Sequence, residues 1–251
     1  MLSALERRIP GKVLFTGGCI MPQGTENHIR LLAYVAPFVL YVVPTMMEST
    51  GWLGLRYEVI CTAKGILSAA ALWLFRRHYP AFSIVGFRLA ITAGVVGCII
   101  WVTLEPLQSK LPVIRQLTAW MFQGNRVGFD PFADGGLSAW KTAFVIIRLI
   151  ELAVIVPLAE ELFWRGFLAR YLIADDFESV SHGQFTLFSF VVVTIAFASV
   201  HPEFLAATVW CILINALYRK TRNLWACVTM HSVTNGLLGG YILLTKNWHL
   251  W

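Results

Sequence analysis

Long apolar runs separated by short polar and basic connections dominate the hydrophobic pattern of the chain. Seven runs reach or approach the length of a membrane span, and they cover about residues 31–47, 59–75, 83–104, 139–173, 185–200, 204–217 and 224–244. An apolar stretch of about 20 residues can cross a bilayer as a helix. The pattern therefore predicts an all-α fold, a polytopic transmembrane helical bundle with about seven spans.

The connections complete the predicted domain organisation. Residues 1–29 are polar and basic and are expected to form an N-terminal tail, whereas residues 30–251 form a single transmembrane domain. Between 105 and 140, apolar residues recur at helical spacing before a loop rich in glycine, which predicts an interfacial amphipathic helix and a cap at Ser138. The run from 139 to 173 is too long for one perpendicular span, so we expect it to tilt, to kink near Pro157 or to leave the membrane.

Composition agrees with a membrane protein and limits the partners. The 251 residues are 57% hydrophobic and 14% charged, and the mean hydropathy is +0.67. The net charge of +6 comes from basic residues between the apolar runs and not from one basic face, so we expect the lipid bilayer as a partner and no nucleic acid. The positive-inside rule places the N terminus in the cytoplasm, and a bacterial inner (plasma) membrane is the expected location.

Three charged residues interrupt the fourth run. Glu160, Glu161 and Arg165 lie within an otherwise apolar segment. Each ionisable residue at the centre of a membrane helix costs roughly 2.5–3.5 kcal/mol, so their presence indicates mutual pairing or a function. On a helix Glu161 and Arg165 share a face, which predicts that Arg165 positions Glu161 and that Glu160 faces the interior of the bundle.

Two later runs supply further polar residues. Phe197 and His201 end one apolar run, and His231 and Asn235 lie four residues apart in another. With a helical rise of about 1.5 Å per residue, Glu160, His201 and His231 all fall in the middle half of the bilayer. The sequence thus predicts one polar site at mid-membrane depth.

These residues resemble the CPBP family of intramembrane proteases, which includes the type II CAAX prenyl endopeptidases. The family patterns Glu-Glu-x-x-x-Arg, Phe-x-x-x-His and His-x-x-x-Asn occur here in order, over about residues 142–245. The resemblance implies a hydrolase, a glutamic-type intramembrane endopeptidase of the CAAX protease type. The N-terminal half is also similar to the CAAX-protease-related proteins that accompany exosortase systems.

The resemblance also implies roles for the matching residues. Glu160, with Glu161 beside it, would activate a water as general base, and His201 would share that water. His231 and Asn235 would donate hydrogen bonds to the oxygen of the attacked carbonyl. Phe197 would pack around the site. The implied substrate is a membrane-inserted or lipidated peptide or protein.

Two alternatives remain open. Glu160, His201 and His231 are acceptable zinc ligands, but no His-Glu-x-x-His helix preorganises them, so we expect neither a metal nor another cofactor. The same polar residues could instead serve a non-catalytic membrane protein, such as a transporter, a binding protein or an immunity protein.

Overall fold

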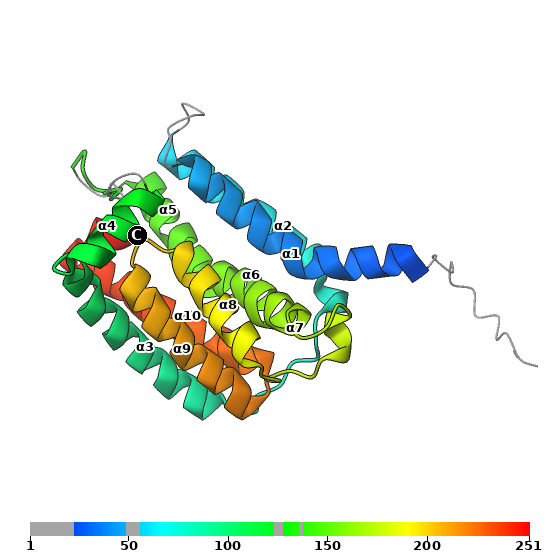
Figure 1. The fold of residues 1–251 in the computed structure, drawn as a ribbon. Coiled ribbons are helices and arrows are strands. Elements are labelled where there is room, and N and C mark those ends of the chain that lie inside the picture. The colour runs from blue at the N-terminus through cyan, green and yellow to red at the C-terminus, as the bar shows by residue number, and fades with distance from the viewer. Residues whose placement is uncertain (1–22, 49–55, 123–127, 136–137) are drawn as a thin grey trace, which may run out of the picture.

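The computed structural model describes residues 23–48, 56–122, 128–135 and 138–251, and every regular element in these ranges is a helix (Figure 1). The first helices are α1 (Gln23–Glu48), α2 (Tyr57–Leu74), α3 (Phe87–Gln108) and α4 (Pro112–Phe122). Because α1 begins at Gln23, it includes the end of the predicted tail. The rest of that tail lies outside the described residues.

The fourth apolar run forms one continuous helix from Ala139 to Tyr171. Within it α5 (Ala139–Ile150), α6 (Val156–Glu161) and α7 (Ala169–Tyr171) alternate with two π-helical segments, Glu151–Ile155 and Leu162–Leu168. The predicted cap is confirmed, because the Ser138 hydroxyl accepts a hydrogen bond from the Lys141 amide at 3.3 Å. The long helix therefore has one wide, π-helical segment before Glu160 and Glu161 and another after them. The sequence analysis expected a tilt, a kink near Pro157 or an exit from the membrane, and it did not predict these segments.

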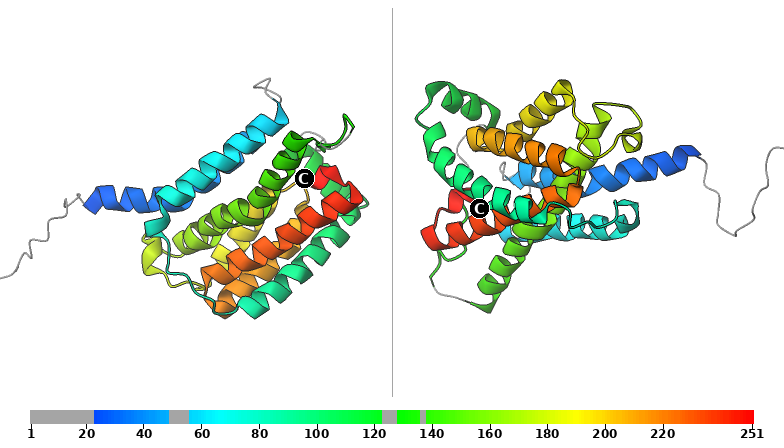
Figure 2. Two further views of the ribbon diagram at one scale, coloured as in Figure 1. Left: turned by 180° about the vertical axis from the view of Figure 1, so that it is seen from behind. Right: turned by 90° about the horizontal axis from the view of Figure 1, so that it is seen from below.

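Three helices complete the bundle: α8 (Leu187–Ser199), α9 (Phe204–Thr221) and α10 (Leu224–Thr245). Helix α10 packs chiefly on α3, and α9 lies between α3 and α8. Figure 2 shows α1 and α2 as a pair on the other side of the long helix. The largest buried cluster, which includes Phe197, Trp210 and Met230, lies among the long helix, α3 and α8–α10.

A proline in α1 illustrates how the bundle satisfies its backbone. Pro37 has no amide hydrogen, so it cannot bond the carbonyl of Ala33 one helical turn earlier. That carbonyl instead accepts a hydrogen bond from the Tyr79 hydroxyl at 3.1 Å. The connection between α2 and α3 thereby stabilises the proline-containing turn.

The predicted number of spans is not confirmed. In the described part of the chain, four helices are long and apolar enough to cross a membrane, namely 27–46, 57–74, 87–108 and 139–171. Helix α8 is apolar but short, and α9 and α10 have sufficient length but contain polar residues that lower their hydropathy. These polar residues include His231 and Asn235 on α10.

Candidate active site

Glu161 lies at the centre of a buried ionic network. Its Oε1 accepts hydrogen bonds from Arg165 Nη1 at 3.1 Å and from His231 Nδ1 at 2.8 Å. The side chains of Glu161 and Arg165 are fully buried, and that of His231 is nearly so. The predicted pairing of Glu161 with Arg165 is confirmed, whereas the bond from His231 was not predicted.

Arg165 uses its other nitrogens to connect the network to α9. Its Nε donates to Asn215 Oδ1 at 3.2 Å and its Nη2 donates to Cys211 Sγ at 3.1 Å. The guanidinium carbon also lies 5.4 Å from the centre of the Phe197 ring. Sequence reasoning missed Asn215 and Cys211, although an asparagine in the apolar stretch of α9 is a signal of a buried polar contact.

Glu160 differs from Glu161 in its partners. Glu160 forms no ion pair with a described residue, whereas Glu161 Oε1 forms two. The Oε2 atom of each carboxylate and Trp164 Nε1 are buried without a hydrogen-bond partner within the described residues. The charged or ionisable side chains that face Glu160 are His231, Glu161 and Arg165. The Trp164 indole lies close enough to Glu160 to interact with its carboxylate, although the geometry falls short of a hydrogen bond, so the pair is suited to binding a small polar group.

The two histidines lie on either side of a pair of stacked aromatic rings. Phe197 and Trp210 stack with 5.3 Å between ring centres, His201 stacks on Phe197 at 4.3 Å, and His231 meets Trp210 edge-on at 4.7 Å. His201 Nδ1 lies 2.7 Å from the Phe197 carbonyl oxygen, which can only accept a hydrogen bond, so Nδ1 carries the proton. In a neutral His201 ring this tautomer makes Nε2 the acceptor.

Asn235 bonds the backbone of the long helix. In the first π segment the Val156 amide donates to the carbonyl of Glu151, five residues earlier. The same five-residue spacing would make Pro157 the donor to the Leu152 carbonyl, but proline has no amide hydrogen. Asn235 Nδ2 instead donates to the Leu152 carbonyl at 3.0 Å. Since an amide group has two hydrogens, the second is the one that could bind a substrate oxygen.

The zinc alternative requires at least three ligand side chains close together. Among the residues that the structure describes, no three His, Cys, Asp or Glu side chains lie together as a metal site requires. His231 uses Nδ1 to bond Glu161, and His201 lies beyond the Phe197 and Trp210 rings. The expectation that Glu160, His201 and His231 form no zinc site therefore stays a prediction that a chelator can test.

A second buried cluster lies between α1, α2 and the long helix. Arg148 Nη1 is 3.4 Å from Glu151 Oε2 and donates to the Tyr41 hydroxyl at 2.7 Å. Lys64 Nζ donates to Thr45 Oγ1 at 3.0 Å. These contacts stabilise the helix that carries Glu160 and Glu161 against the α1–α2 pair.

Together, the helices and the buried Glu–Arg–His network define a helical integral membrane protein with a polar site inside its bundle. The family model for type II CAAX prenyl endopeptidase Rce1-like proteins matches residues 142–237. The matched segment contains every residue predicted for the site, from Glu160 to Asn235, and confirms the resemblance for this part of the chain. It supports a CAAX-type intramembrane endopeptidase. No curated protein and no solved structure matches the chain.

Proposed function

We propose that this protein is an intramembrane endopeptidase that hydrolyses a peptide bond of a membrane-associated or lipidated substrate. The observation that carries the proposal is the contrast between two adjacent carboxylates. Glu161 Oε1 is held by Arg165 and His231, whereas Glu160 forms no ion pair with a described residue, although the Oε2 atom of each carboxylate is buried without a hydrogen-bond partner there. Glu160 is therefore the carboxylate available to bind and deprotonate a water.

The reaction would begin with Glu160 taking a proton from the water as its oxygen attacks the carbonyl carbon. We assign the sharing of this water to His201 from the family resemblance; its ring is held by the bond from Nδ1 to the Phe197 carbonyl. The carbonyl oxygen becomes negatively charged as the tetrahedral intermediate forms. When the carbon–nitrogen bond breaks, the proton held by Glu160 passes to the leaving amine.

His231 and Asn235 would stabilise the charged oxygen. The bond from His231 Nδ1 to Glu161 fixes the direction of the ring, so Nε2 is the nitrogen that would face the charged oxygen. Asn235 can add its second amide hydrogen while the first remains on Leu152. A missing donor of this kind typically costs about 100- to 1000-fold in kcat.

The test is cleavage by the purified protein in liposomes that carry candidate membrane-tethered peptides, with and without a chelator. We expect a product whose new carboxyl terminus contains oxygen from the solvent, at a rate that the chelator does not change. Loss of cleavage on chelation, restored by zinc, would overturn the metal-free mechanism. Absence of cleavage of every substrate by folded protein would favour the non-catalytic alternative, a binding protein or a transporter.

A further inference from the structure

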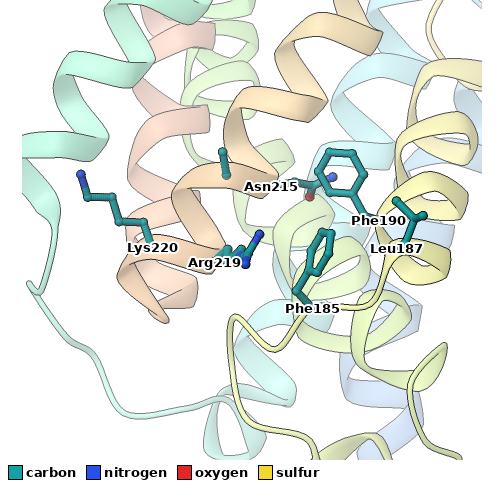
Figure 3. A pocket seen from close by; sticks show the side chains of 7 residues that line it. Phe185, Leu187, Phe190, Asn215, Arg219 and Lys220 are labelled. Atoms are coloured by element: carbon teal, nitrogen blue, oxygen red, sulfur yellow. The ribbon is translucent and has the colours of Figure 1, made fainter.

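A groove of about 460 Å³ lies between the beginning of α8 and the end of α9 (Figure 3). It is separate from the motif residues. The residues that line it are Phe185, Leu187, Phe190, Asn215, Ala216, Arg219 and Lys220. Its apolar walls thus meet basic residues at the end of α9.

The apolar side of the groove continues onto a surface suited to lipid. Leu187, Phe188 and Ile195 on α8 are 70%, 62% and 59% exposed. In a membrane protein, such side chains contact acyl chains instead of water. A lipid chain beside α8 can therefore extend over Phe185 and Phe190 without leaving an apolar environment.

The charged end of the groove lacks an acidic partner. The Arg219 guanidinium lies over the Phe185 ring, 4.7 Å from its centre, and neither Arg219 nor Lys220 forms an ion pair with a described residue. Between residues 181 and 222 the sole acidic residue is Glu203, which is buried at the opposite end of α9. The local charge therefore favours an anion.

We propose that this groove binds an anionic phospholipid, with the phosphate on Arg219 and an acyl chain against Phe185 and Phe190. A soluble anion would use the guanidinium but would leave the aromatic walls uncovered, whereas a phospholipid matches both parts of the groove. Asn215 connects the groove to the ionic network, because its Oδ1 accepts a hydrogen bond from Arg165. The proposal does not rest on the proposed protease function.

The experiment measures lipid binding by the full chain in detergent with native mass spectrometry. The probes are dioleoylphosphatidylglycerol and dioleoylphosphatidylcholine, and inorganic phosphate is the competitor. Arg219→Gln removes the side chain proposed to bind the phosphate, and Ala216→Phe fills the groove without changing its charge. Lys220→Gln is the matched control, since it removes the same charge from the same end of α9 although its side chain points away from both phenylalanine rings (Figure 3).

We expect phosphatidylglycerol to bind more tightly than phosphatidylcholine. Arg219→Gln should weaken that binding roughly tenfold or more, as expected for loss of a hydrogen bond to a charged group. Ala216→Phe should weaken it as well, and Lys220→Gln should retain most of it. Equal binding of both lipids, displacement by millimolar inorganic phosphate, or equal losses in the two charge variants would overturn the proposal.

Discussion

His231 on α10 donates its Nδ1 hydrogen to Glu161 Oε1 on the long helix, at a distance of 2.8 Å. The same oxygen accepts from Arg165, so one carboxylate oxygen joins two helices and two basic side chains. This bond fixes the direction of the His231 ring and holds Glu161, whereas Glu160 forms no ion pair with a described residue.

Replacement of Glu161 should damage the fold as well as the activity. Glu161→Gln removes the charge that balances Arg165, which is fully buried. Removing one partner of a buried ion pair lowers the free energy of unfolding by about 3–5 kcal/mol, because the remaining charge is uncompensated. Unfolding of the purified variant in a mixed-detergent titration should show this loss, whereas Glu160→Gln, measured in parallel, should unfold like the wild type. Equal stability of both variants would contradict the structural role of Glu161.

The bond between Asn235 and Leu152 allows the structural and catalytic roles of Asn235 to be separated. Asn235→Leu should cost about 1–3 kcal/mol, since the Leu152 carbonyl loses its donor. Adding Pro157→Ala supplies a backbone amide that can donate a hydrogen bond to this carbonyl in place of Asn235. We expect the double variant to recover stability but not cleavage. Recovery of both would show that Asn235 acts only through the helix, and recovery of neither would contradict the role of Pro157.

Gly65 should not tolerate a side chain. A Cβ at this position would lie 2.0 Å from Glu151 Oε1, so Gly65→Ala must displace the carboxylate that pairs with Arg148. Overpacking of this kind typically costs about 1–3 kcal/mol. The control is Gly240→Ala on α10, where a Cβ meets no atom within 4 Å. Thermal unfolding should show a lower Tm for the first variant and an unchanged or higher Tm for the control.

The loop before α8 should make stability depend on pH. Burial, together with the nearby charge of Arg170, lowers the pKa of His182 to about 4 from its usual 6.5. The unfolded chain therefore binds a proton near pH 6.5 that the folded chain does not bind until about pH 4, so stability should fall as the pH decreases between these values. His182 Nδ1 lies 2.7 Å from the Tyr218 hydroxyl, which donates to the Arg165 carbonyl.

The measurement is the Tm of the wild type and of His182→Asn between pH 7.5 and 4.5. The difference between the two proteins should narrow as the pH falls, because only the wild type loses the contribution of His182. A difference that stays constant over this range would contradict the lowered pKa.

Local spacing predicted part of the site, and tertiary contacts determined the rest. The pairing of Glu161 with Arg165 follows from residues four apart on one helix, and the structure confirms it. The bond from His231 to Glu161 joins residues seventy positions apart, so no local pattern specifies it. Sequence reasoning instead assigned His231 to the substrate oxygen, a role that stays a prediction.

The helical fold and the fourth long helix were also evident from the sequence, but the π segments were not. A π-helical turn needs hydrogen-bond partners for the backbone groups that it leaves unpaired. Here the Leu152 carbonyl accepts its hydrogen bond from Asn235, which lies on another helix. Asn215 was missed because its importance comes from Arg165 and not from its neighbours in α9. The predicted span count stays unconfirmed, because polar residues lower the hydropathy of α9 and α10, among them Arg219 and Lys220 at the end of α9 and His231 and Asn235 in α10.

The most direct test of the account is the rate of peptide cleavage by Glu160→Gln relative to the wild type, in a preparation whose unfolding transition matches that of the wild type. Glutamine is nearly isosteric with glutamate but cannot take a proton from water. Loss of a general base typically costs about 100- to 10,000-fold, so we expect cleavage to fall by at least that lower factor. Turnover near the wild-type rate would contradict the assignment of Glu160 as the general base.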